Sequence, residues 1–341
     1  MGVMPLSPGS SSASGSAAPL LRIENLAVAY KIGLRRSLRA VSGVSLEVAR
    51  GSTLALIGES GSGKSTIARA VCGLGPIERG VVSIAGTDIA QRKDRAAAAG
   101  SLGVQIVFQD PISALNPRWP IWRSIAEPRL RLFPPSPDGH RALAVELLER
   151  VGLDRSMADR VPSQLSGGQR QRVTIARALS PEPKLIILDE AVSALDVSVR
   201  NEILALLDEL KRERGLTYLL ISHDMGAVIQ IASEVAVLYL GKLVEVGRAV
   251  EVIGRSLHPY TRALIRAVPV LNAVATEPAR RLSGEIGDPA NPPPGCRFHP
   301  RCRFAIARCS EEEPLLRELN NRQVACHRAD EIAKQEIDAP A

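Results

Sequence analysis

The sequence predicts an α/β fold with a largely parallel core sheet, and three features of the chain support this prediction. Short aliphatic runs with the length of buried strands alternate with longer segments of helical character. A glycine-rich turn follows one such strand and leads into a helix, and two acidic residues directly follow another strand. Because parallel α/β sheets bind ligands beyond the carboxyl ends of their strands, both features point to a site at that edge.

The predicted elements alternate along most of the chain. Strands are expected at Leu20–Tyr30, Val44–Val48, Thr53–Ile57, Val104–Phe108, Leu185–Leu188 and Thr217–Ser222. Helices are expected at Ser65–Cys72, Arg141–Val151, Ser166–Ser180, Val199–Arg212 and His258–Val268. A basic loop, Lys31–Arg39, is expected to separate the first two strands.

Domain organisation is inferred from changes in composition. Residues 1–19 are rich in Ser, Ala, Gly and Pro and are expected to form a disordered leader. Residues 20–270 are expected to form one large α/β domain, with a mostly helical part at about 111–180. Residues 271–341 are expected to form a small appended domain, because they contain a proline-rich stretch and four of the five cysteines.

Composition and charge exclude two classes of protein. The formal net charge is +7, but the arginines are scattered and only 3% of residues are aromatic, so no nucleic-acid partner is expected. No apolar run approaches the roughly 20 residues that cross a bilayer. The leader lacks the apolar core of a secretory signal. We therefore expect a soluble chain that reaches a membrane only through partners.

A phosphate-binding loop (P-loop) is predicted directly after the strand Thr53–Ile57. It matches G-x-x-x-x-G-K-[ST] and consists of Gly58, Glu59, Ser60, Gly61, Ser62, Gly63, Lys64, Ser65 and Thr66. The glycines let several backbone N–H groups converge on one phosphate, and the next helix points its positive end at the same anion. Lys64 is expected to reach the β- and γ-phosphates of the bound ligand, and Ser65 to ligate Mg²⁺.

Two carboxylates follow the predicted buried strand Leu185–Leu188. Asp189 is expected to anchor Mg²⁺, and Glu190 to act as the general base that polarises the attacking water. The alternative is that both residues are ordinary solvated acids after a core strand. The presence of a P-loop motif in the same chain makes this alternative less favourable.

The pentapeptide Leu-Ser-Gly-Gly-Gln at residues 165–169 resembles the signature of ABC-type ATPases. This resemblance implies that Ser166, Gly167, Gly168 and Gln169 of one subunit bind the γ-phosphate of ATP held by the P-loop of another. ATP would then join two nucleotide-binding domains, and the free N–H groups of a helix N-terminus suit such an anion. The resemblance also implies the family fold, in which an antiparallel subdomain and a helical subdomain accompany the parallel core sheet.

Further family motifs follow in order between about Leu20 and Val268. Gln109 resembles the Q-loop glutamine that senses Mg²⁺ and the attacking water, Asp196 belongs to a segment resembling the D-loop, and His223 resembles the switch histidine at the γ-phosphate. Tyr30 resembles the aromatic residue that stacks on adenine. With each catalytic position present, the resemblance implies an active ATPase that binds ATP and Mg²⁺.

Three segments, at 110–118, 258–264 and 284–289, resemble the ATP-binding subunits of dipeptide and oligopeptide importers. The resemblance implies a peripheral subunit at the cytoplasmic face of the inner or plasma membrane. Its partners would be two transmembrane permease subunits, a second ABC ATPase subunit (a paralogue or a second copy) and, indirectly, an extracytoplasmic solute-binding protein. The ATPase does not touch the cargo, so its sequence leaves the transported solute open.

Four cysteines near the C-terminus form a candidate metal site: Cys296, Cys302, Cys309 and Cys326. In a cytosolic chain, clustered thiols favour metal binding over a disulfide framework. Four thiolates can hold a [4Fe–4S] cluster or Zn²⁺, and the spacing differs from that of zinc ribbons. The family resemblance implies the iron–sulfur cluster. Four reduced cysteines that only pack remain the alternative.

A soluble ABC ATPase that acts in DNA repair or on ribosomes is the competing hypothesis for the whole chain. Chromosome-type relatives separate the P-loop and signature by a long coiled coil, whereas only roughly 100 residues without a heptad pattern separate them here. Ribosome-acting relatives usually carry two such domains in one chain. A third hypothesis, an iron–sulfur redox sensor with a vestigial ATPase, fits poorly with the complete set of catalytic residues.

Overall fold

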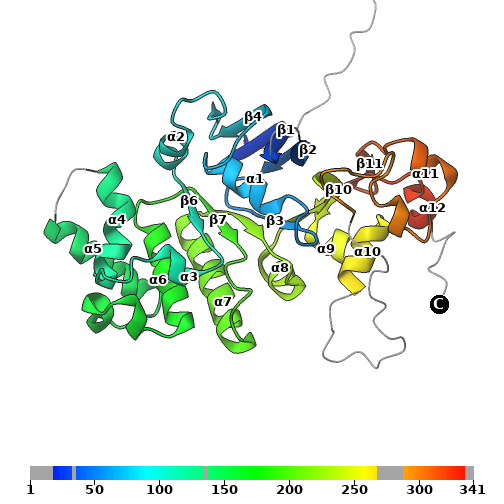
Figure 1. Cartoon of the computed structure of the whole chain (residues 1–341). Coiled ribbons are helices and arrows are strands. Elements are labelled where there is room, and N and C mark those ends of the chain that lie inside the picture. Colours follow the sequence, from blue (N-terminus) through cyan, green and yellow to red (C-terminus); the bar gives the residue numbers. More distant parts are fainter. Residues whose placement is uncertain (1–17, 33–35, 134–136, 267–286, 335–341) are drawn as a thin grey trace, which may run out of the picture.

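The computed structural model describes residues 18–32, 36–133, 137–266 and 287–334. Most of the leader predicted at residues 1–19, and the domain boundary predicted near residue 270, lie outside these ranges. Residues 284–286 of the importer-like segment at 284–289 also lie outside the described ranges. Figure 1 shows a smaller sheet at the top, a larger sheet across the middle and most of the helices below it.

The smaller sheet is antiparallel, with the strand order β2–β1–β4–β5 within the described residues. Its strands are β1 (Leu21–Ile32), β2 (Arg36–Val48), β4 (Arg79–Ile84) and β5 (Thr87–Asp88). The predicted basic loop at Lys31–Arg39 is wrong over most of its length, because Lys31 pairs with Ser37 and Ile32 with Arg36. Backbone pairing in a hairpin continues where the side chains are polar and exposed, so hydrophobic alternation underestimates strand length.

The larger sheet has the order β11–β12–β10–β9–β3–β8–β7–β6 within the described residues. Its parallel strands are β9 (Glu234–Tyr239), β3 (Thr53–Ile57), β8 (Thr217–Ile221), β7 (Leu185–Asp189) and β6 (Val104–Val107). Antiparallel strands β10 (Lys242–Arg248), β12 (Arg322–Val324) and β11 (Arg317–Leu319) extend one edge. The largely parallel core sheet predicted from the sequence is confirmed.

Helices cover both faces of the larger sheet. Helix α1 (Lys64–Val71) lies between the two sheets, as Figure 1 shows. The opposite face packs against α6 (Gly167–Leu179), α7 (Val197–Arg214) and α8 (Met225–Ile231), while α4 (Ile121–Leu132) and α5 (Pro137–Arg150) pack against α6. Shorter helices are α2 (Arg95–Ser101), α3 (Pro111–Ala114), α9 (Ala249–Gly254) and α10 (Pro259–Arg266).

Burial of both faces explains why the central strands are uniformly apolar. In β3, Leu54 and Leu56 belong to the core shared with α1 and the smaller sheet, whereas Ala55 and Ile57 belong to the core shared with the helical layer. Successive side chains of a strand point to opposite faces, so one short strand contributes to two hydrophobic cores.

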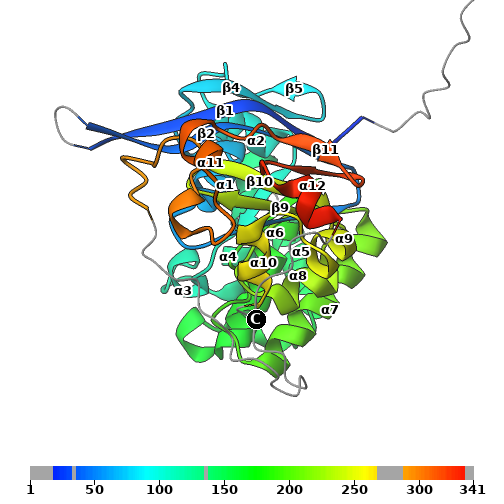
Figure 2. The same cartoon turned by 90° about the vertical axis from the view of Figure 1, so that its right-hand side faces the viewer.

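Residues 287–334, which we call the C-terminal segment, are not detached from the larger sheet. Strand β12 of this segment pairs with β10, with Glu245 opposite Val324. The segment also contains the 3-10 turn η3 (His299–Arg301) and the helices α11 (Ala307–Glu311) and α12 (Ala329–Ala333). Figure 2 shows it facing the viewer, in front of β9 and β10.

Candidate functional site

The predicted site residues follow four neighbouring parallel strands of the larger sheet. The P-loop follows β3, His223 follows β8, Asp189 and Glu190 end or follow β7, and Gln109 follows β6. The strand order β3–β8–β7–β6 therefore aligns these groups along one carboxyl edge.

The P-loop is shaped by glycines in conformations that side chains rarely adopt. Gly58 has φ 151° and Gly63 has φ 109°. A Cβ atom at Gly58 would lie 2.2 Å from the carbonyl oxygen of Leu238, and one at Gly63 would lie 2.4 Å from the carbonyl oxygen of Ala40. These positions require glycine because the loop passes directly against two other backbone segments.

Lys64 is buried inside this loop. Its Nζ atom donates to the carbonyl oxygen of Gly58 at 2.8 Å and to that of Glu59 at 2.9 Å. Burial lowers the pKa of Lys64, while the charges of Glu190, Asp189 and Glu59 oppose that shift. The loop thus presents one cation among carboxylates, beside the N-terminus of α1, which is an arrangement suited to a polyphosphate.

Ser65, Asp189 and Glu190 link the P-loop to the acidic end of β7. The Ser65 hydroxyl donates to Asp189 Oδ1 at 3.0 Å. Burial raises the pKa of Asp189, although the hydrogen bond from Ser65 opposes the shift. A hydroxyl and a partly buried carboxylate are hard oxygen donors of the kind that Mg²⁺ prefers, so these residues fit that ion.

Glu190 is oriented by residues from both neighbouring strands. Gln109 Nε2 donates to Glu190 Oε2 at 3.0 Å, and His223 Nδ1 lies 3.4 Å from Glu190 Oε1. The backbone N–H of Glu190 donates to Ile221, and Glu190 has φ 51°. Three residues predicted from separate motifs therefore form one connected group beside the P-loop.

The signature turn lies at the start of α6 and is capped by its own residues. Ser166 Oγ accepts a hydrogen bond from the backbone N–H of Gln169, and Gln169 Oε1 accepts one from that of Ser166. A Cβ atom at Gly168 would lie 2.7 Å from Val199 in the first turn of α7. Asp196 caps α7 by accepting from the Val199 N–H at 3.0 Å.

The signature turn and the P-loop are separate within one chain. No hydrogen bond or ion pair between residues 165–169 and 58–66 occurs in the part of the chain that the structure describes. The motif thus does not complete the site of its own chain. Tyr30 is half-buried on β1, where it packs against the core around α1 and pairs with Leu38, so a stacking role for it stays a prediction.

The four cysteines of the C-terminal segment line one small cavity, together with Phe298, His299 and His327. All four are free thiols. Burial raises the pKa of Cys302 to about 11 and that of Cys326 to about 12. Among the described residues, no group of three or more His, Cys, Asp and Glu side chains is placed to hold a metal ion.

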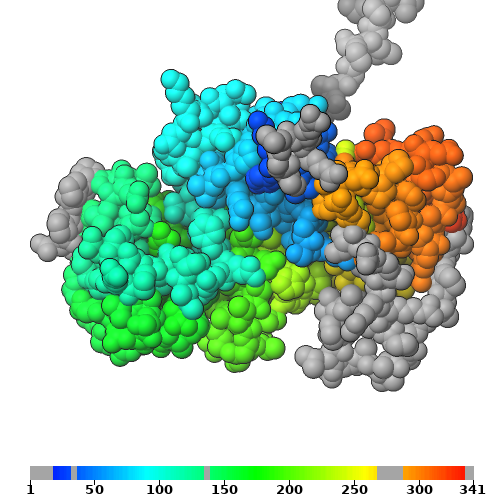
Figure 3. Space-filling view, in the orientation of Figure 1, coloured from blue at the N-terminus to red at the C-terminus, as the bar shows by residue number. Residues whose placement is uncertain are grey.

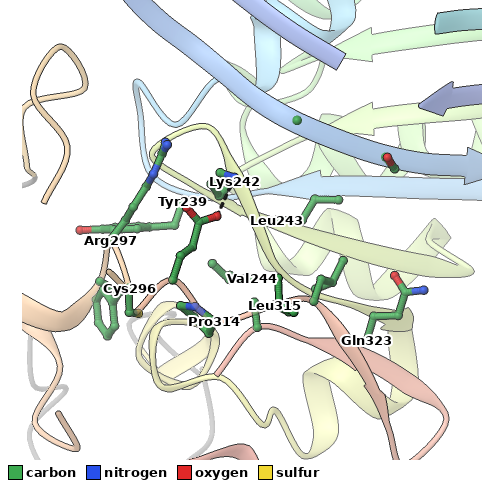
Figure 4. A pocket seen from close by; sticks show the side chains of 15 residues that line it. Tyr239, Lys242, Leu243, Val244, Cys296, Arg297, Pro314, Leu315 and Gln323 are labelled. Atoms are coloured by element: carbon green, nitrogen blue, oxygen red, sulfur yellow. Dashed lines mark ion pairs between the residues drawn. The ribbon is translucent and has the colours of Figure 1, made fainter. Parts of the chain in front are cut away.

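A larger cavity of about 320 Å³ lies between β10 and the C-terminal segment. Figure 4 shows its lining residues, including the ion pair between Lys242 and Glu313 at one side. Cys296 and Phe298 line both this cavity and the four-cysteine cavity.

Two residues that motif analysis did not single out also contact the P-loop. Arg301 of η3 forms an ion pair with Glu59, and the Tyr260 hydroxyl accepts a hydrogen bond from the Glu59 N–H. Tyr260 belongs to the importer-like segment 258–264, and Arg301 lies next to the candidate metal ligand Cys302. No spacing rule connects either residue with a loop that lies more than about 200 residues earlier in the chain.

Comparisons with known proteins are consistent with this geometry. Residues 41–193 match the family described as "ABC transporter", and residues 244–309 match "Oligopeptide/dipeptide transporter, C-terminal region". The dimeric ATP-binding cassette MJ0796 bound to ADP and Pi is a similar solved structure. It has a TM-score of 0.61 and 28% identity, over 67% of this chain and 98% of that chain.

Curated relatives cover nearly the whole chain. The probable peptide ABC transporter ATP-binding protein y4tS of Sinorhizobium fredii is 46% identical, over 90% of this chain and 89% of its own length. The dipeptide transport ATP-binding protein DppF of Escherichia coli is 41% identical, over 92% of this chain and 95% of its own length.

Proposed function

Because this chain belongs to the family of ATP-binding subunits of peptide ABC transporters, we propose that it hydrolyses ATP to drive the import of di- or oligopeptides. One observation of the structure supports the proposal above all others. The P-loop, the acids after β7, Gln109 and His223 form a connected set along one sheet edge.

The reaction is phosphoryl transfer from ATP to water, in which positioning and charge neutralisation carry most of the catalysis. Lys64 and the N–H groups of the P-loop bind the phosphates. Ser65, Gln109 and Asp189 would hold Mg²⁺, which would supply further neutralisation of the phosphate charge. Glu190 accepts the proton of the attacking water, and its contacts with Gln109 and His223 hold its carboxylate in place.

The second half of each ATP site comes from a second ATPase subunit. Ser166, Gly167, Gly168 and Gln169 stand at a capped helix N-terminus that does not contact the P-loop of the same chain. Each such turn binds the γ-phosphate of the ATP held by its partner. ATP therefore holds two subunits together, and hydrolysis releases them.

If each ATP site needs two subunits, ATP turnover should depend on the protein concentration. The ATP turnover per chain is expected to rise with protein concentration until the dimer is saturated, because a monomer holds only half of each site. Phosphate release measured across a dilution series tests this. A turnover per chain that stays constant across the series, from a chain that remains monomeric with ATP, would contradict the shared site.

Within the described residues, no helix is long and apolar enough to cross a membrane. We propose that the chain works at the cytoplasmic face of the membrane, bound to two transmembrane permease subunits that receive peptides from a solute-binding protein. The competing function is a soluble ABC ATPase that is not coupled to transport.

Purification from gently solubilised membranes separates these two functions. The tagged chain should recover two multi-span permease subunits, identified by mass spectrometry. The tagged Glu190→Gln variant should recover the same permease subunits. Cells that carry only this variant should take up no labelled dipeptide. Recovery of ribosomes, DNA or soluble proteins alone would refute the transport function and leave the ATPase in place.

We also propose that Cys296, Cys302, Cys309 and Cys326 hold a [4Fe–4S] cluster. In support, four thiols from separated positions line one cavity. Four thiolates are the usual ligand set of such a cluster.

Metal analysis tests the cluster. The chain purified without oxygen is expected to contain iron and acid-labile sulfide in equal amounts, and Cys302→Ser is expected to lose most of both. Cys72→Ser is the matched control, since Cys72 is a buried free thiol that does not line the cavity. Zinc without sulfide would favour the alternative ion, and neither metal would favour thiols that only pack.

A further inference from the structure

The C-terminal segment reaches the P-loop through one arginine. Arg301 Nη1 lies 2.7 Å from Glu59 Oε2, and Arg301 Nη2 lies 2.9 Å from Glu59 Oε1, so the pair is bidentate. The Arg301 side chain is only 5% exposed, and that of Glu59 is 20% exposed. Figure 3 shows the C-terminal segment (orange) packed directly against the blue part of the body to which the P-loop belongs.

Every polar group of Glu59 has a partner, and two of these partners come from distant parts of the chain. Its carboxylate binds Arg301, its N–H donates to the Tyr260 hydroxyl at 2.7 Å, and its carbonyl oxygen accepts from Lys64. Tyr260 is fully buried. The path of the P-loop at its second residue is therefore determined by η3 and α10 as well as by β3 and α1.

Aromatic packing holds Arg301 in place. The Tyr239 and Tyr260 rings lie 4.6 Å apart, and Phe298 packs on both of them at 5.3 and 5.4 Å. Arg301 lies against this cluster, with its guanidinium 5.9 Å from the centres of the Tyr239 and Phe298 rings. Since Phe298 and Arg301 belong to the same short turn, the cluster positions the arginine before any nucleotide binds.

The charge of Glu59 gives this contact a consequence for nucleotide binding. A carboxylate at the second position of a phosphate-binding loop repels the phosphates, because like charges in a poorly solvated place interact strongly. Arg301 cancels that charge, and the ion pair raises the pKa of Arg301 further, so the arginine stays charged.

We propose that Arg301 is a positioning residue of the nucleotide site, so that the affinity of the P-loop for ATP depends on the C-terminal segment. This inference rests on the proposed function, since it assumes that the P-loop binds nucleotide. Arg301, which contacts the P-loop, directly precedes Cys302, which lines the four-cysteine cavity. Two neighbouring residues of the C-terminal segment therefore connect the cavity with the P-loop.

Calorimetric titration of the full-length chain with Mg–ADP tests the proposal without turnover. Arg301→Met is expected to raise the ADP dissociation constant about tenfold, because it leaves Glu59 charged and unpaired beside the phosphates. Adding Glu59→Gln to that variant is expected to restore the affinity to within about threefold of the wild type. A purely structural role would lower the melting temperature without nucleotide in Arg301→Met and restore it in the double variant, so thermal melting of both variants accompanies the titration.

Two further variants keep the test decisive if Arg301→Met unfolds, which thermal melting without nucleotide will reveal. Arg301→Lys retains the charge but loses the bidentate fork, and Tyr260→Phe leaves the Glu59 N–H without its acceptor. Each is expected to raise the dissociation constant about threefold. Arg303→Met is the matched control, because Arg303 is exposed two positions further along and should change nothing.

The outcomes separate this inference from the function on which it rests. Unchanged ADP affinity in folded Arg301→Met, or no rescue by Glu59→Gln, would overturn the role of Arg301. The reference variant is Lys64→Ala, which should weaken ADP binding in any case. If neither the wild type nor the variants bind ADP, the nucleotide site itself is wrong.

Discussion

Replacing Glu190 with glutamine is expected to lower ATP turnover by about 10²–10⁴-fold, the usual contribution of a general base. ATP binding should persist, because the amide keeps the shape of the side chain and leaves the P-loop, Ser65 and Asp189 in place. Gln109 donates to the Glu190 carboxylate, and an amide oxygen at that position still accepts this hydrogen bond. The loss should therefore fall on the chemical step.

Two measurements separate the chemical step from binding. Phosphate release at saturating ATP gives turnover, and size-exclusion chromatography with ATP should show a dimer that persists, because hydrolysis no longer releases it. Glu209→Gln makes the same chemical change on an exposed face of α7 and serves as the control. Normal turnover in Glu190→Gln would remove Glu190 from the role of base.

Gly58→Ala is expected to disrupt the P-loop and abolish detectable nucleotide binding. The methyl group would sit 2.2 Å from the carbonyl oxygen of Leu238 on the neighbouring strand, and the φ of 151° is itself unfavourable for alanine. The backbone strain alone costs about 1–3 kcal/mol, and displacing a main-chain carbonyl adds to it. We expect a loss of about 3 kcal/mol or more in the free energy of unfolding.

Gly61→Ala provides a control within the same loop. Gly61 also has positive φ, at 78°, but a Cβ atom there would meet nothing within 4 Å. Gly61→Ala should lower the free energy of unfolding by about 1 kcal/mol through backbone strain and leave the ADP affinity within a few-fold of the wild type. Urea denaturation and calorimetry on both variants check these values. Equal effects at the two glycines would show that close approach to Leu238 is unimportant.

The catalytic half-site was predictable because each of its residues belongs to a local motif. Strand-to-turn patterns located Lys64, Asp189, Glu190 and His223 at strand ends, and the parallel order of the strands then brings those ends to one edge. Helix α6 was predicted to within one residue at each end, and in the structure Ser166 and Gln169 form a capping box at its start. The roles of these residues remain predictions until variants are measured.

Short-range sequence patterns were enough to predict the buried strands, the glycine-rich turn, helix α6 and the two acids at the end of β7. Contacts between distant residues became visible only in the folded chain. Tertiary structure extended β1 and β2 through the predicted basic loop, added β12 to the main sheet beside β10, and brought Arg301 onto Glu59. The reason is that a local pattern reflects the preferences of neighbouring residues, whereas an ion pair across about 240 residues depends on how the whole chain packs.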